Sequence, residues 1–236
     1  MKTFAGLPLT VKANPRAKRV LVKLVPGQGV EVVTPNGFSS HLVPDILEEK
    51  RGWIERTRDR MVVRGTDLSG RLPDLPDSID FRAWGRTVRV DYLDRGDRAK
   101  VVENAVRLQI SGPVEDRAAI LKALQSFTLK KARQVLLPWL EAVSDRTGLA
   151  YSALRVRRQK TRWGSCSSRG TISLNAKLLF LPPDLVEHLL LHELCHTRHL
   201  NHSNAYWACV ARFQPDYRRL EDEVRRGGKF VPSWFA

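Results

Sequence analysis

Residues 192–202 read HELCHTRHLNH, and they are the most informative part of the chain. Two histidines four positions apart on a helix project from the same face, so His192 and His196 can offer imidazole nitrogens to one tetrahedral metal ion. Glu193 follows the first of them, where a carboxylate can take a proton from a metal-activated water without binding the metal. The pattern therefore predicts a zinc site with Glu193 as its general base.

The pattern requires a helix, and the preceding residues predict one. Pro182-Pro183-Asp184 is typical of a helix start. Apolar residues then recur at helical spacing: Leu185, Val186, Leu189, Leu190 and Leu194. We expect this helix to be largely buried, because a dry wall strengthens the electrostatic interactions of a metal site.

Three further histidines lie near this pair and are alternatives for a third ligand. His188 lies one turn before His192, from where a metal held by the pair is awkward to reach, so we expect it in the core or behind the ligands. Three ligands from one straight helix line up rather than converge, which argues against His199. Asn201 tolerates a left-handed conformation and can end the helix, which lets His202 turn back toward the metal. Geometry favours His202 over His199.

Cys195 lies within the same stretch and is an alternative sulfur ligand. A helix places it about 100° away from His196, toward the core. Free cysteine usually behaves as a small hydrophobic residue, so we interpret Cys195 as a packing residue.

The composition indicates a cytoplasmic protein. The three cysteines form no even framework and fit a reducing compartment. No apolar run reaches the roughly 18 residues of a membrane-spanning helix. Pro8, Lys12 and Pro15 interrupt the start before a signal-peptide core can form.

The chain is predicted to have a strand-rich region over residues 1–113 and a catalytic core over residues 114–236. Alternating apolar residues predict strands at Val20–Leu24, Val30–Val33, Thr87–Tyr92 and Ala105–Ile110. A helix is expected at about residues 45–62. The boundary is placed near Pro113, where the pattern turns from strands to helix.

The second region is predicted to be mainly helical. A helix starts near Asp116, is kinked or restarted by Pro138, and ends at Gly148. Residues 155–156 and 171–174 are expected to form a small antiparallel sheet beside the zinc helix, and Ser203 to cap a further helix. The fold class is therefore α+β: a zincin-like helical core with a small antiparallel sheet, plus an N-terminal strand-rich region.

Basic residues give the chain a strong positive charge, with 40 Lys and Arg against 25 Asp and Glu and a net charge of +15. Residues 155–177 contain seven of these cations and no acid. Such a segment favours binding of nucleic acid or another polyanion, in which Trp163 beside Arg162 could stack on a base. A solvated basic surface explains the charge equally well, because no complete nucleic-acid-binding motif accompanies it.

Further motifs surround the zinc stretch: RRQKTRWGSCS at residues 157–167, Leu174-Asn175, Asn201-His202-Ser203 and Tyr206-Trp207. Together with residues 192–196 they resemble the bacterial YgjP-like metallopeptidases, which are related to the WLM and SprT-like groups. The resemblance implies a zinc-dependent hydrolase with three ligands, His192, His196 and His202, and Glu193 as the catalytic residue. Tyr206 stands where relatives commonly carry phenylalanine, which implies an added hydroxyl near the metal.

Two other functions compete with peptide hydrolysis. A nucleotide phosphohydrolase would use the same zinc and clamp phosphates with arginines such as Arg162, but the chain has no second carboxylate cluster and no glycine-rich phosphate loop. A zinc-stapled nucleic-acid-binding module would need four closed protein ligands, whereas Glu193 beside three histidines indicates an open position. We therefore predict a zinc metallopeptidase that acts on a peptide or protein substrate, with no membrane partner. Arg162 and Tyr206 are its candidate substrate or oxyanion contacts.

Overall fold

The computed structural model describes residues 2–25, 27–63, 68–70 and 72–235. The chain divides into two compact units, Met1–Asp74 and Leu75–Ala236. Each unit has its own hydrophobic core, so each is described by itself.

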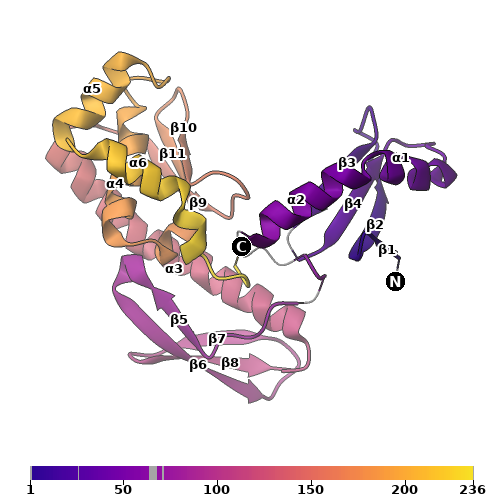
Figure 1. Ribbon diagram of the computed structural model, residues 1–236. Helices are drawn as coiled ribbons and strands as arrows, with labels where there is room; N and C mark the ends of the chain where they lie inside the picture. Colours follow the sequence, from indigo (N-terminus) through magenta and orange to yellow (C-terminus); the bar gives the residue numbers. More distant parts are fainter. Residues whose placement is uncertain (1, 26, 64–67, 71, 236) are drawn as a thin grey trace. The chain divides into compact units, whose positions relative to one another are not determined.

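The first unit is a four-stranded sheet with helices. Its strands are β1 (Thr3–Phe4), β2 (Leu7–Ala13), β3 (Leu21–Val25) and β4 (Gly29–Thr34), and they lie in the order β1-β2-β4-β3. Val30 and Val32 alternate along β4 and point to one face of the sheet. There they pack with residues of α1 (Val43–Glu49) and α2 (Arg51–Val63). Figure 1 shows these two helices beside the sheet. The helix expected at residues 45–62 is thus two helices that meet at Lys50.

The second unit begins with a sheet of the same topology. Its strands are β5 (Ser78–Phe81), β6 (Arg86–Asp94), β7 (Lys100–Glu103) and β8 (Arg107–Gly112), in the order β5-β6-β8-β7. In both sheets the second and fourth strands are parallel, and the other pairs are antiparallel. The long helix α3 (Arg117–Thr147) buries Ile120 and Leu124 in the same core as Leu108 and Ile110 of β8.

The boundary between the units differs from the one predicted near Pro113, which lies inside the second unit between β8 and α3. The physical reason is the shared core: apolar residues of β5–β8 lie in the same hydrophobic core as those of α3. A change from strands to helix along the sequence marks a change of secondary structure only. Pro138 also does not restart α3, which runs through it and ends at Gly148 in the left-handed conformation.

A three-stranded sheet and three helices complete the second unit. The strands are β9 (Ala153–Arg157), β10 (Gly164–Cys166) and β11 (Thr171–Asn175), in the order β10-β11-β9. The helices are α4 (Pro183–Cys195), α5 (Asn204–Phe213) and α6 (Tyr217–Arg225). Short 3-10 helices lie at Ser40–Leu42, Arg82–Trp84, Ala176–Phe180 and Gly227–Phe230.

The α+β class is confirmed, but the small sheet is mixed and not antiparallel. The expected pair, β9 and β11, runs parallel. The antiparallel hairpin is formed by β10 and β11, so β9 pairs with the other edge of β11. The crossover between β9 and β10 is fixed by Asn175, whose side-chain amide donates to the carbonyls of Gln159 and Arg162. This places β10 at a sheet edge, against α4.

Candidate metal centre

Helix α4 forms where the sequence predicts it and carries the first part of the site. Pro183 occupies the start of the helix. Asp184 lies in the first turn, where its negative charge interacts favourably with the helix dipole. Leu185, Val186 and Leu190 are fully buried and fix the helix in the core. The C-terminal end of the helix carries the two histidines, His192 in the last turn and His196 at the C-terminal cap.

The chain turns back after α4 and brings a third histidine to this pair. Nε2 of His202 lies 3.1 Å from Nε2 of His196 and 3.2 Å from Nε2 of His192. Helix α5 fixes this return, because the hydroxyl of Ser203 accepts from the backbone N–H of Tyr206 and caps it, as predicted. The structure therefore places together the three histidines that the sequence analysis singled out.

Aromatic rings hold the histidines in place. The ring of Tyr206 stacks on His196 with centroids 4.5 Å apart, and the ring of Trp207 stacks on His202 at 5.4 Å. Trp207 stacks in turn on Tyr217 of α6 at 5.1 Å. These contacts restrict the rotation of the imidazoles before any ligand binds.

The hydrogen bonds of the histidines select the form that binds a cation. Nδ1 of His192 lies 2.9 Å from a carboxylate oxygen of Glu221, and Nδ1 of His196 lies 2.9 Å from the carbonyl oxygen of His199. Both acceptors require a proton on Nδ1, which leaves the lone pair of each neutral ring on Nε2. Two lone pairs and Nε2 of His202 thus converge on one point, where a divalent cation would relieve their repulsion. The donor set therefore fits a metal ion.

Glu221 of α6 is the residue that sequence reasoning missed. Its carboxylate bridges two histidines of α4, since Nε2 of His188 also lies 3.0 Å from it. Burial opposes ionisation of Glu221, yet the hydrogen bonds from His188 and His192 hold its pKa below the ordinary value. The charged carboxylate therefore orients His192 from behind. No spacing rule joins residue 221 to the stretch 192–202, so no local signal could have identified it.

His188 and His199 lie beside the site without directing their rings into it. His188 is fully buried, and its nitrogens face Gln214 at 2.6 Å and Glu221 at 3.0 Å. This agrees with the expectation that His188 lies behind the ligands. His199 contributes its backbone carbonyl to His196.

Glu193 follows His192 in α4 and lies in a nearly dry position. Its side chain is buried, and its Oε2 atom has no hydrogen-bond partner among the described residues. Burial raises the pKa of Glu193 to about 8, while Arg162 opposes the rise and Glu221 adds to it. A carboxyl group with a raised pKa and an unpartnered oxygen is suited to accept and release a proton near neutral pH.

Gly164 of β10 provides the space for Glu193. A Cβ atom at this position would overlap the side chain of Glu193, starting with its Oε1 atom. Glycine is thus required at this position of the RWGSCS segment, because a side chain there would occupy the space of the Glu193 carboxyl group. This contact also places edge strand β10 directly beside Glu193.

Gly164→Ala should lower the free energy of unfolding by about 1–3 kcal/mol, because the new methyl group forces Glu193 or β10 to move. Gly228→Ala is the matched control, since nothing lies within 4 Å of the added atom. It should leave stability unchanged or raise it slightly. Urea unfolding measures both variants, and equal stability of the two would contradict the close packing of Gly164 on Glu193.

The two candidate oxyanion contacts are placed differently. Tyr206 is fully buried, and burial raises the pKa of its hydroxyl well above the ordinary value. This hydroxyl donates to the backbone carbonyl of His192 at 3.2 Å. Arg162 is exposed and lies close enough to Glu193 to act on its pKa.

The cysteines are free thiols outside the histidine cluster. Cys195 is fully buried, as predicted, and it forms a hydrogen bond with Cys209 of α5. Burial raises the pKa of Cys166 on β10, and the charge of Glu193 adds to this. Cys166 therefore lies near the carboxyl group of the site.

Only some of the basic side chains in residues 155–177 are available to contact a polyanion. Arg155 and Arg157 are exposed at alternate positions of β9. Arg158 instead donates to Gln125 and lies over the ring of Phe235 at 5.2 Å. These contacts give some of the segment's charge a structural role.

Three converging imidazoles and a buried carboxyl group next to them in sequence are typical of metal-dependent hydrolases of the metallopeptidase class. The chain belongs to the YgjP-like family, whose model, described as "YgjP-like, metallopeptidase domain", matches residues 18–226. No curated protein shows significant similarity to the chain. None of the helices in the described residues is both long and apolar enough to cross a membrane.

Two solved structures show local similarity to the chain. The metallopeptidase zymogen abylysin of Pyrococcus abyssi is 28% identical, with a TM-score of 0.34, over 36% of this chain and 87% of its own. The metallopeptidase zymogen jannalysin of Methanocaldococcus jannaschii is 17% identical, with a TM-score of 0.33, over 37% of this chain and 90% of its own.

Proposed function

We propose that this metallopeptidase is zinc-dependent, that His192, His196 and His202 are its metal ligands, and that Glu193 is its general base. The observation that carries the proposal is the convergence of three Nε2 atoms, two of them freed by hydrogen bonds at Nδ1. Three imidazole nitrogens with one position left open suit catalytic zinc.

A bound zinc ion would supply Lewis-acid chemistry, which activates a water molecule and polarises the scissile carbonyl. Proton transfer is assigned to a residue of the chain itself. Glu193 takes it from the attacking water and passes it to the leaving amine, so one carboxyl group serves both steps. The dry surroundings that raise the pKa of Glu193 help it to hold the proton between the two steps.

Strand β10 is the proposed binding site for the peptide substrate. It lies at the edge of its sheet and beside Glu193 through Gly164. An extended peptide can pair with such an edge through backbone hydrogen bonds, which gives binding that depends little on side chains. Arg162, just before β10, is the proposed oxyanion contact. Tyr206 is proposed to act through its ring, which positions His196, since its hydroxyl already donates to the main chain.

The proposed function is tested by incubating the zinc-loaded protein with an unfolded protein such as casein and identifying new chain ends by mass spectrometry. Cleavage should stop when a chelator removes the metal and return when zinc is restored. Release of phosphate from nucleotides without peptide cleavage would instead establish a phosphohydrolase. A metal-loaded protein with neither activity would contradict the proposal.

Glu221→Gln should weaken zinc binding by about 10–100-fold, because the neutral amide no longer draws a proton to Nδ1 of His192. Asp222→Asn is the matched control on the same helix, since Asp222 is exposed and pairs with Arg225. Competition with a chromophoric chelator gives both affinities. Equal affinity in the two variants would show that Glu221 does not orient the ligands.

A further inference from the structure

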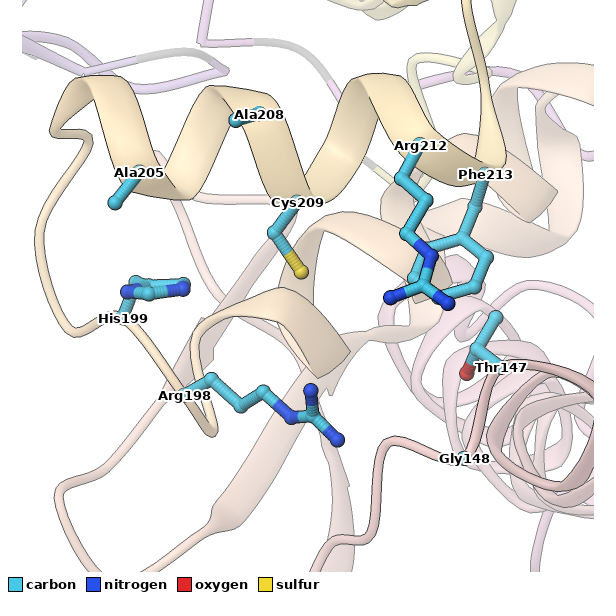
Figure 2. A pocket seen from close by; sticks show the side chains of 9 residues that line it. All are labelled: Thr147, Gly148, Arg198, His199, Ala205, Ala208, Cys209, Arg212 and Phe213. Atoms are coloured by element: carbon cyan, nitrogen blue, oxygen red, sulfur yellow. The ribbon is translucent and has the colours of Figure 1, made fainter.

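A cavity of about 400 Å³ lies beside α5 and is not used by the proposed reaction. Its walls are the end of α3, the loop after α4 and one face of α5, as Figure 2 shows. The α5 residues on this face include Ala205, Cys209 and Arg212, which helical spacing aligns. Tyr206, which packs on the histidines, projects from a different face of the helix. The cavity is therefore distinct from the metal centre.

Two arginines give the cavity its charge. Arg198 and Arg212 both line it, and Figure 2 shows Arg212 extending from α5 toward the side of the cavity that Arg198 occupies. In the described parts of the chain, neither guanidinium forms an ion pair with a carboxylate, and no lining residue is acidic. The guanidinium of Arg212 lies over the ring of Phe213, at 5.5 Å. Two guanidinium groups without a counter-ion form a site that attracts an anion.

The rest of the lining is mixed, with Thr147, Gly148 and His199 beside small and apolar groups. It includes the Phe213 ring, two alanine methyl groups and the thiol of Cys209. A ligand that fits must therefore join a charged group to an apolar body.

We propose that this cavity binds a small organic anion. Its phosphate or carboxylate group lies between Arg198 and Arg212, each of which can donate two hydrogen bonds from its planar fork. Its apolar part packs against Phe213 and the alanines of α5.

The test is calorimetric titration of the full-length protein with phenyl phosphate, benzoate and phenol. Phenyl phosphate should bind at one saturable site, and phenol, which lacks the charge, should not bind. Comparison with benzoate distinguishes a requirement for phosphate from one that a carboxylate also meets. Because phosphate also coordinates metals, the titration is repeated after the metal is removed, and the binding should persist.

Variants assign the binding to the cavity. Arg198→Gln and Arg212→Gln should each weaken phenyl phosphate binding by about tenfold or more, since each removes charge-assisted hydrogen bonds. Arg133→Gln, at an exposed arginine of α3 outside the cavity, is the matched control and should bind as the wild type does. Ala205→Phe should abolish binding by filling the cavity while keeping both arginines.

Three results would overturn the proposal. Binding that does not saturate, or that weakens equally in the Arg133→Gln control, would reflect only the general attraction of a chain with net charge +15. Unchanged binding by Ala205→Phe would place the anion elsewhere. None of these readouts uses peptide hydrolysis, so failure here is distinguishable from failure of the proposed function.

Discussion

Glu193→Gln is expected to lower the rate of peptide hydrolysis by about 100-fold to 10,000-fold while the protein keeps its metal and its fold. Glutamine has nearly the shape of glutamate, so it still fits beside Gly164. It cannot accept the proton of the attacking water, and this loss acts on the chemical step. The fall should therefore appear in kcat more than in KM.

The matched control for this variant is Glu187→Gln, the same change on the same helix. Glu187 contacts Trp139 and Arg146 and lies outside the histidine cluster. Its variant should hydrolyse peptide at nearly the wild-type rate. If Glu193→Gln instead kept at least half of the activity with full metal content, Glu193 would not be the general base.

His202→Ala is expected to lose most of the bound zinc, whereas His199→Ala keeps it. His202 directs Nε2 at the other two histidines, but His199 contacts His196 through its backbone carbonyl, which alanine also supplies. Removing one of three protein ligands leaves only two, too few for a tight zinc site. The wild type should hold about one zinc ion per chain by elemental analysis.

Circular dichroism provides the folding control for these variants. His202 is exposed, and the apolar core beneath α4 does not include it, so both variants should remain helical. The reverse order, with zinc lost from His199→Ala and kept by His202→Ala, would contradict the proposed ligand set. Equal retention of zinc by both would show that neither side chain is a ligand.

The sequence predicts the parts of the site that depend on local pattern. Helix α4 follows from a proline start and apolar residues at helical spacing, and its two histidines share a face for the same reason. The position of His202 follows from a geometric requirement, since ligands must converge and one straight helix cannot supply three of them. Nε2 of His202 lies close to Nε2 of His192 and His196, and the role of His202 as a ligand stays a prediction.

The parts that sequence reasoning missed depend on contacts between distant segments. Gly164 and Glu221 touch the site from β10 and α6, and neither spacing nor composition links them to α4. The pairing of β9 with β11 was wrong in direction because it depends on where β10 lies. The boundary between the units likewise depends on which core each strand joins.

During translation, the three histidines at positions 192, 196 and 202 are synthesised before α6. Until Glu221 emerges, neither His188 nor His192 has its carboxylate partner, so the donors are not yet oriented. Trp234 and Phe235, which pack on Phe180, are synthesised later still. Hydrolytic capacity would therefore arise only after α6 and these aromatic residues have been synthesised.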